Sequence, residues 1–296
     1  MNSTSNSPFI PLLTTTDWNA EWIELQKARR HADNAEFWDK KAANFGDKDA
    51  PSNYVNAFLD LIQLEPDDTV FDMGCGNGGL AIPLALRGHK VLACDFSQGM
   101  LNFLEQSRDE KGLTNLIDTK LLSWADDWEA FGVGENCVDV AIASRSIATS
   151  NLQDSLLRLN RVARKRACIT LTTGASPRSD ERVLTELGLQ NQVGRDYLYA
   201  FNILAQLGLK PSISYIESEK DDTFDSYEEA LEALTRMVND VTTPLPQIER
   251  DAALERLREW LTSDLEPNTD PSPDAKKLRL SQPRRITWAF ISWNTK

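Results

Sequence analysis

A run of ten residues, Val70 to Gly79, constrains the fold of this chain most strongly. It begins with four residues typical of a buried strand and continues with glycines at positions 74, 76 and 78. Because glycine has no Cβ atom, it permits a sharp turn and a close approach of the backbone to a ligand. A helix is expected over Gly79–Leu86 and a second strand over Lys90–Cys94. This order of elements is typical of parallel α/β sheets that bind nucleosides.

An acid at the end of the second expected strand supports the same interpretation. Asp95 follows Gly74 by about 20 residues, the distance at which a carboxylate meets ribose hydroxyls in such folds. A glycine run by itself can also be a plain tight turn. Its position between a strand and a helix, with the acid at this distance, favours nucleoside binding.

The spacing of the glycines bears on the kind of cofactor. Dinucleotide-binding turns use Gly-x-Gly-x-x-Gly, so that a pyrophosphate rests on the helix N-terminus. Here the pattern is Asp72-x-Gly74-x-Gly76-x-Gly78, and a carboxylate at the strand end would repel a pyrophosphate. An acid at this place suits a cationic, amino-bearing ligand instead. The pattern therefore disfavours a nicotinamide-dependent oxidoreductase.

The segment Val70–Gly79 followed by Asp95 resembles the class I S-adenosylmethionine-dependent methyltransferase family, in particular its small-molecule members with an Asp-x-Gly-Cys-Gly-x-Gly turn. The resemblance covers about Asp67–Thr173. It implies S-adenosyl-L-methionine as cofactor and in-line transfer of a methyl group to a small or medium-sized acceptor. A non-catalytic S-adenosylmethionine-binding module and an RNA or protein methyltransferase are the alternatives. The cofactor contacts that the resemblance implies are Asp72, Gly74, Cys75, Gly76, Asn77 and Gly78 for the methionine part, Asp95 for the ribose and Phe96 for the adenine.

The end of the third expected strand departs from the family pattern. The acid that commonly follows this strand is missing, so Ser123 or Trp124 would meet the adenine. Core packing is the alternative for Trp124, because large aromatic side chains bury well.

Substrate-side candidates lie further along the chain. Ser144 and Arg145 follow the strand Val138–Ala143, at the edge where open α/β sheets place their ligands. Ser144 would contact the cofactor, and Arg145 would pair either with an anionic group of the acceptor or with a local acid. Tyr197 and Tyr199, with Asn202, would line the acceptor pocket or belong to a core stripe at helical spacing.

Strands that alternate with helices predict an α/β fold, Rossmann-like and doubly wound around a mostly parallel seven-stranded sheet. Residues 1–16 are expected to form a flexible tail, 17–63 a helical lid, and 64–296 the methyltransferase domain with a helical insertion at about 221–283. The Pro-rich stretch Glu266–Lys277 is expected to be a loop before the last strand. By resemblance, the lid would close over the cofactor with Phe37, Trp38, Asp39 and Phe45.

The charge balance argues against nucleic acid as the main partner. The chain has 32 Lys and Arg against 45 Asp and Glu, a formal net charge of −13, whereas phosphate-backbone binding needs clustered cations. We attribute the cluster Arg158, Arg161 and Arg164–Arg166 to the last turns of a helix, where cations offset the helix dipole. The expected partner is a small-molecule acceptor, in the cytoplasm and with no membrane span, in a possible homodimer.

No general base and no metal site emerge from the sequence. His31 and His89 are both expected on the surface, far from where a base would stand. The four cysteines include no Cys-x-x-Cys pair, and with two histidines they assemble no zinc site. Free thiols in a reducing cytosol are the expectation.

Overall fold

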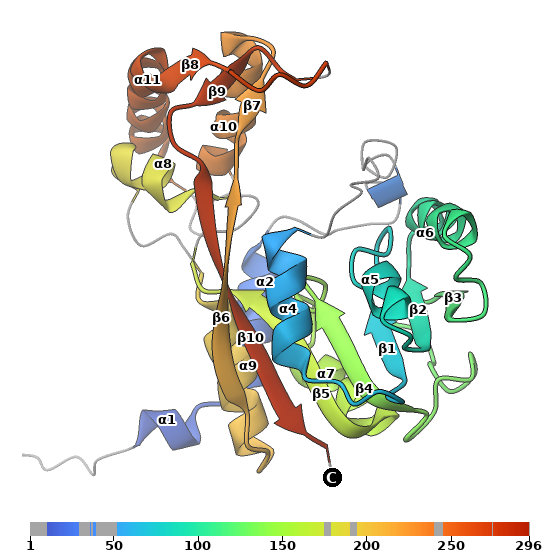
Figure 1. Cartoon of the computed structure of the whole chain (residues 1–296). Helices are drawn as coiled ribbons and strands as arrows, with labels where there is room; N and C mark the ends of the chain where they lie inside the picture. The colour runs from blue at the N-terminus through green and yellow to red at the C-terminus, as the bar shows by residue number, and fades with distance from the viewer. Residues whose placement is uncertain are drawn as a thin grey trace, which may run out of the picture.

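A seven-stranded sheet forms the centre of the molecule (Figure 1). The computed structural model describes residues 11–29, 36, 38–39, 52–174, 179–189, 194–239, 245–273 and 275–295. The sheet has the order β3-β2-β1-β4-β5-β10-β6, in which the first five strands are parallel and β10 runs antiparallel to both β5 and β6. The predicted fold class is confirmed. The strands are β1 (Val70–Met73), β2 (Val91–Asp95), β3 (Ile117–Leu121), β4 (Val138–Ser144), β5 (Ala163–Thr172), β6 (Ser212–Lys220) and β10 (Arg284–Asn294).

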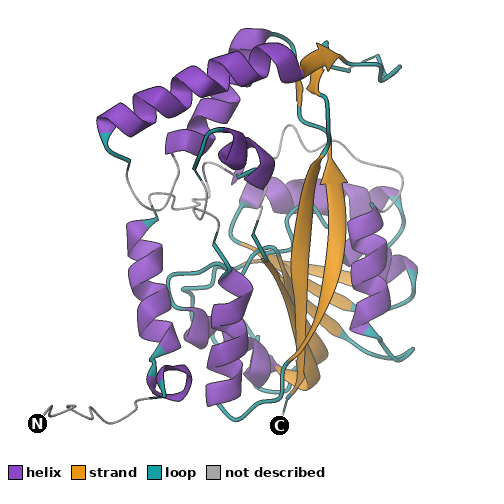
Figure 2. Cartoon of the chain, turned by 90° about the vertical axis from the view of Figure 1, so that its left-hand side faces the viewer, coloured by secondary structure: helices purple, strands orange, loops and turns teal. Residues whose placement is uncertain are grey.

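Helices cover both faces of this sheet (Figure 2). One face packs against α4 (Asn53–Ile62), α5 (Ala81–Leu86) and α6 (Gln98–Glu110), and the other against α2 (Trp18–Ala28), α7 (Leu152–Val162) and α9 (Asp196–Gln206). The last strand shows the period of two that this arrangement requires. Trp288 and Phe290 belong to the core of the α4 face, while Ala289, Ile291 and Trp293 belong to that of the α2 face.

The strand β5 begins at Ala163, directly after α7, and so earlier than the sequence pattern indicates. The cations Arg164, Lys165 and Arg166 therefore lie on a strand, and their assignment to the last turns of a helix was wrong. They are used locally, because Arg164 pairs with Asp139 at 3.0 Å and Lys165 contacts Glu65 and Asp68, both at 2.6 Å. In the preceding helix, Arg158 and Arg161 pair with Asp154 and Glu129.

A smaller body stands at the far end of the long ribbon formed by β6 and β10 (Figure 1). It consists of α8 (Glu181–Glu186), β7 (Thr223–Phe224), α10 (Tyr227–Asn239), α11 (Gln247–Asp264), β8 (Leu265–Pro267) and β9 (Leu278–Leu280). Its core is a separate apolar cluster built around Leu184, Leu234, Leu257 and Leu261. Because α8 precedes β6 in the chain, this body is not one continuous insertion.

The stretch expected to be a loop, Glu266–Lys277, begins within β8, so that expectation was wrong for Glu266 and Pro267. The small sheet has the order β7-β9-β8, and Arg279 on β9 pairs with Glu266 at 2.6 Å. The strands β7, β8 and β9 have only two or three residues each, too few to show the alternation of apolar and polar residues by which a strand is recognised in a sequence.

The N-terminal segments lie against both faces of the sheet. A short helix, α1 (Leu12–Thr15), falls in the expected tail, and α2 packs on α7 and α9. On the other face, α4 contacts β6 and β10. Phe37 and Phe45 lie outside the described residues. Among the helices that the structure describes, none is long and apolar enough to cross a bilayer.

Candidate active site

The glycine turn leaves the carboxyl end of β1. The backbone N–H groups of Gly74 and Cys75 both donate to the carbonyl of Cys94, at 2.7 and 3.0 Å. Gly74, Gly76 and Gly78 all have positive φ, which strains any residue with a Cβ atom. These two hydrogen bonds join the end of β1 to the end of β2 and hold the glycine turn next to Asp95.

The three glycines have different neighbours. A Cβ atom on Gly74 would lie 2.3 Å from Cβ of Ser146, and one on Gly78 would lie 2.4 Å from Cδ1 of Leu104. A Cβ atom on Gly76 would meet nothing within 4 Å. Gly74 and Gly78 are therefore required by packing, whereas Gly76 presents bare backbone to open space, as a ligand cradle must.

Asp95 lies beside this open position. Its Oδ2 atom accepts from the N–H of Gly76 at 2.8 Å, and its Oδ1 atom accepts from the N–H of Ser97 at 2.9 Å. The side chain is buried, and burial raises the pKa of the carboxyl above its usual value. Each carboxylate oxygen has a second lone pair, so two hydroxyl donors can still be accepted. The arrangement has room in its hydrogen bonding for the two hydroxyl groups of a ribose.

Asp72 is a buried carboxylate with one oxygen that lacks a hydrogen-bond donor among the described residues. It is 2% exposed, and its Oδ2 atom has no hydrogen-bond partner among the described residues. Burial, together with the nearby charge of Asp95, raises the pKa of Asp72 to about 7. A buried acceptor without a donor is costly unless a ligand supplies one. An ammonium group at this place fits both the unused oxygen and the charge.

The loop after β4 lies across the glycine turn. The hydroxyl of Ser146 donates to the carbonyl of Met73 at 2.6 Å, and the indole N–H of Trp124 donates to the carbonyl of Ser146 at 3.0 Å. Trp124 is half-buried and packs on Trp128, with ring centroids 5.3 Å apart. These contacts favour core packing for Trp124 over the adenine contact.

A carboxylate does lie at the end of β3, although no acid follows this strand directly. Asp126 folds back, and its Oδ2 atom accepts from the N–H of Ser123 at 2.7 Å. The hydroxyl of Ser123 accepts from the N–H of Ala125 at 3.2 Å. Sequence reasoning missed Asp126 because it comes three residues after Ser123 and not directly after the strand. The signal in the sequence was the Ser-x-x-Asp pattern, which is typical of a local turn closed by a side chain.

A second group of polar residues gathers where β4 and β5 end. The hydroxyl of Tyr54, on α4, is within hydrogen-bond distance of Ser144 Oγ at 2.7 Å and of Thr170 Oγ1 at 2.8 Å. The guanidinium carbon of Arg145 lies 4.4 Å from the centroid of the Tyr54 ring and 5.8 Å from that of Trp288. Sequence reasoning missed Tyr54, because its spacing on α4 matches that of the core residues around it.

Tyr197 and Tyr199 do not join this group. They pack against the core of the α2 face, whereas Tyr54 and Trp288 belong to the core of the α4 face. Tyr199 donates to Glu21 at 2.7 Å, and the Tyr197 ring contacts that of Tyr215. The side chain of Asn202 donates within its own helix, to the carbonyl of Leu198. The core-stripe interpretation therefore accounts for the contacts of both tyrosines.

The segment before α4 reaches the cofactor side of the sheet. Oδ1 of Asp39 accepts from the hydroxyl of Ser97 at 2.5 Å and from the N–H of Gly99 at 3.0 Å. These donors belong to the first turn of α6, directly after Asp95 and the half-buried Phe96. A carboxylate at a helix N-terminus is stabilised by the helix dipole. Asp39 is thus hydrogen-bonded to the start of α6, next to the loop that carries Asp95.

His89 lies away from this site, in the turn before β2. His89 was expected on the surface, but it is 7% exposed, and its Nδ1 atom lies 3.0 Å from the carbonyl of Asp68. The interpretation was wrong because His89 satisfies its ring nitrogen inside the turn before β2. His31 lies outside the described residues. In the part of the chain that is described, no cluster of three or more His, Cys, Asp or Glu side chains is placed to hold a metal ion.

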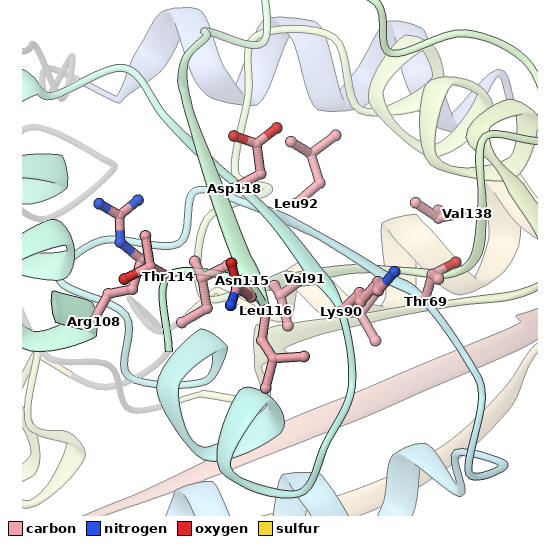
Figure 3. Close-up of a pocket in the computed structure, with 12 residues that line it drawn as sticks. Thr69, Lys90, Val91, Leu92, Arg108, Thr114, Asn115, Leu116, Asp118 and Val138 are labelled. Atoms are coloured by element: carbon pink, nitrogen blue, oxygen red, sulfur yellow. The ribbon is translucent and has the colours of Figure 1, made fainter. Parts of the chain in front are cut away.

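A cavity of about 520 Å³ lies elsewhere, at the opposite edge of the sheet (Figure 3). Thr69, Lys90 and Asp118 in its lining stand at the amino ends of β1, β2 and β3. Parallel α/β sheets bind their ligands at the carboxyl ends of the strands. We therefore assign the site to the glycine turn and not to this cavity.

Comparison with known proteins agrees with this geometry. The profile of a family described as a methyltransferase domain matches residues 70–166. An uncharacterized protein of Haemophilus influenzae is 35% identical over 203 residues, which are 66% of this chain and 71% of that protein. Among solved structures, geranyl diphosphate C-methyltransferase from Streptomyces coelicolor is similar with a TM-score of 0.47 and 16% identity, over 98% of this chain and 100% of that one.

A methyltransferase from Aquifex aeolicus described as dependent on S-adenosylmethionine is similar with a TM-score of 0.47 and 17% identity, over 62% of this chain and 92% of that one. The methyltransferase-domain match covers β1 to the start of β5, and so includes the glycine turn, Asp95 and the end of β4. Residues 70–166 of this chain therefore form a domain of the methyltransferase-domain family.

Proposed function

We propose that this methyltransferase acts on a small or medium-sized acceptor and that its cofactor lies along the glycine turn. The observation that carries the proposal is the open backbone of Gly76 between two buried acids, Asp72 and Asp95. One acid has an unused oxygen suited to an ammonium group, and the other has unused lone pairs suited to hydroxyl groups.

Each side chain at the turn has a distinct task in this proposal. Asp72 accepts from the amino group of the methionine part, and Asp95 accepts from the ribose hydroxyls. Phe96 lies beside the adenine, and Asp126 with Ser123 provides acceptors near its amino group. The bound cofactor supplies a methyl group that is already activated by a sulfonium. The chain mainly has to align the acceptor in line with that methyl and exclude water, so a general base is not required.

The ion pairs of the basic cluster disfavour the RNA alternative. Arg158, Arg161, Arg164 and Lys165 are each paired with a carboxylate, so they form no free positive track for a phosphate backbone. The other alternative, a non-catalytic protein that binds S-adenosylmethionine, would use the same cofactor site and would differ from an enzyme only in transferring no methyl group. Release of S-adenosylhomocysteine in the presence of an acceptor would decide between them.

The direct test is calorimetric titration of the protein with S-adenosylmethionine, S-adenosylhomocysteine and NADH. We expect the first two to bind and NADH not to bind. Asp95→Ala should abolish binding, because the ribose hydroxyls lose their acceptor. Asp118→Ala is the matched control, since Asp118 is an exposed acid at the amino end of β3. Equal affinity of both variants for S-adenosylmethionine would contradict the assignment of the site.

A further inference from the structure

Arg145 has an unusual backbone conformation. Three described residues other than glycine have positive φ, namely Gln63, Asn136 and Arg145. Gln63 ends a helix and asparagine tolerates this region, but Arg145 stands at the end of a central strand with φ of 60°. The left-handed conformation costs about 1–2 kcal/mol for a residue with a Cβ atom. Strain of this kind is retained where the surroundings hold a residue for a task.

The surroundings of Arg145 hold it from two directions. Its backbone N–H donates to Oγ1 of Thr170 at 3.0 Å, and this same hydroxyl meets the hydroxyl of Tyr54. Its guanidinium lies over the rings of Tyr54 and Trp288, which are 3% and 4% exposed. The two rings meet edge to face at 5.8 Å. The aromatic platform is therefore rigid, and the hydroxyls of Ser144 and Thr170 fix the orientation of the Tyr54 ring.

The charge of Arg145 has no partner within the described residues. Several arginines of this acidic chain pair with a carboxylate, such as Arg158 and Arg164, whereas Arg145 is exposed and forms no ion pair within the described residues. A guanidinium that stacks on a ring keeps its N–H donors in its own plane for another partner. Arg195 adds a second cation nearby, since it donates to the carbonyl of Thr173, just after β5.

Arg145 follows β4 at the carboxyl edge of the sheet, next to the strand that leads into the glycine turn. The strand β4 is the direct neighbour of β1, and its end is tied to the glycine turn through Ser146. Burial raises the pKa of the Tyr54 hydroxyl, and the charge of Asp72 adds a smaller contribution in the same direction. Arg145 stands after the strand on one side of β1, which carries Asp72, whereas Asp95 ends β2 on the other side. An anionic group bound by Arg145 would therefore leave Asp95 free for the ribose.

We propose that Arg145 binds an anionic group of the methyl acceptor, a carboxylate or a phosphate, and that Tyr54 is the residue that positions it. This inference rests on the proposed function, because it uses the cofactor site at the glycine turn. Guanidinium binds both anions in the same planar, two-pronged geometry. The acceptor class is therefore narrowed to molecules that carry one of these groups next to the methylated atom.

The test uses the full chain saturated with S-adenosylhomocysteine and three probes: inorganic phosphate, benzoate and the neutral benzamide. We expect one of the anions to bind in calorimetric titration and benzamide to bind at least about tenfold more weakly, since a charge-assisted hydrogen bond contributes about 1.5–3 kcal/mol. The anion that binds identifies the group. Arg145→Ala should weaken it by about tenfold or more, while Arg87→Ala, an exposed arginine at the end of α5, should leave it unchanged.

Tyr54→Phe separates positioning from folding. The ring stays and the hydroxyl bonds to Ser144 and Thr170 are lost, so we expect weaker anion binding with unchanged affinity for S-adenosylhomocysteine. A purely structural role would lower the affinity for both ligands and the melting temperature together. Equal anion affinity of wild type and Arg145→Ala, or no anion binding while S-adenosylhomocysteine still binds, would overturn the inference. Loss of S-adenosylhomocysteine binding by the wild type would overturn the proposed function instead.

Discussion

The carboxyl edge of the large sheet and the small helical body differ in how their most deeply buried charged side chains are paired. At the edge, Asp72 is buried with an unused oxygen and Arg145 is strained with no ion pair within the described residues. In the body and its attachment, Arg284 pairs with the buried Asp222 at 2.8 Å, and Arg182 pairs with Asp180 at 3.0 Å. Unsatisfied groups lower stability unless a ligand completes them. The edge therefore keeps a buried carboxylate that a ligand could complete, whereas Asp222 and Asp180 are paired within the chain.

The largest effect is expected where the body joins the sheet. Arg284 is 4% exposed and lies between Asp222 and Asp180, at 2.8 and 3.9 Å. Arg284→Ala leaves the buried Asp222 without a counter-charge and should cost about 3–5 kcal/mol. Hydrogen exchange should rise in α10 and α11 and stay unchanged in α5, while affinity for S-adenosylmethionine is retained.

The neighbouring Arg285 provides the control for this change. Its pair with Glu219 is exposed, and surface pairs contribute little. Arg285→Ala should therefore leave the exchange of α10 unchanged. If Arg284→Ala abolished cofactor binding while exchange in α10 stayed low, the division between a binding edge and a structural body would be wrong.

Two glycines of the turn should respond differently to the same substitution. Gly74→Ala meets Ser146 at 2.3 Å and adopts a strained φ, so we expect a loss of about 2–4 kcal/mol in the free energy of unfolding. Gly76→Ala adds only the strain, about 1 kcal/mol, but places a methyl group where the cofactor would lie. It should fold and fail to bind S-adenosylmethionine.

The matched control for Gly76 is Gly112, which has φ of 68° and equally open surroundings in the turn after α6. Gly112→Ala carries the same strain away from the site. It should lose similar stability in urea denaturation and keep its affinity for S-adenosylmethionine. Full affinity in Gly76→Ala would mean that the open space beside this glycine is not the cradle.

The pH dependence of stability should reveal Asp72. Its pKa is raised to about 7 in the cofactor-free protein, compared with 3.8 as an ordinary value. The folded chain therefore binds the proton more tightly than the unfolded chain, and stability falls as pH rises between about 4 and 7. Asp72→Asn removes this loss, so the variant should be more stable than wild type at pH 8 by up to about 4 kcal/mol, and equal to it near pH 4.

The affinity for S-adenosylmethionine should depend on pH in the opposite direction to the stability of the cofactor-free protein. An ammonium beside Asp72 favours the carboxylate and lowers its pKa, so the cofactor should bind more tightly above pH 7 than below pH 6. Asp72→Asn should lose both the affinity and its pH dependence. A flat profile of affinity against pH in the wild type would show that this carboxylate does not meet the cofactor.

Sequence reasoning was most successful where chemistry depends on local backbone. Asp72, Gly76 and Asp95 lie where the strand, turn and acid pattern places them, because such turns are determined by neighbouring residues. It failed where contacts join distant segments. Tyr54 reaches Ser144 and Thr170 across 90 and 116 residues, and nothing in the spacing of α4 separates it from a core residue.

The smaller body shows the same limit. Its strands β8 and β9 are three residues each, too short for a period-two pattern, and one of them contains the proline that indicated a loop. The early start of β5 was hidden by the cations of its first residues, which pair with acids distant in the sequence, namely Asp139, Glu65 and Asp68. In both places the partners that complete the strand lie far away along the chain.

The smallest expected effect tests whether the N-terminal segment takes part in binding. Asp39 is exposed and accepts from Ser97 and Gly99 at the start of α6, and these bonds lower the pKa of its carboxyl. Asp39→Asn keeps an acceptor but loses the charge at the helix N-terminus. Since Ser97 also donates its backbone N–H to Asp95, we expect affinity for S-adenosylmethionine to fall by about twofold to threefold.

The lowered pKa sets the conditions under which this effect is visible. The carboxylate of Asp39 is formed above its ordinary pKa, so its contribution is present at neutral pH and lost as pH falls through the lowered value. Asp270 is the control, because it accepts from Ser272 in the same way on the distant body. Asp270→Asn should leave the affinity unchanged at every pH. An equal loss in both variants would mean that net charge, and not the fastening of Asp39 to the ribose loop, sets the affinity.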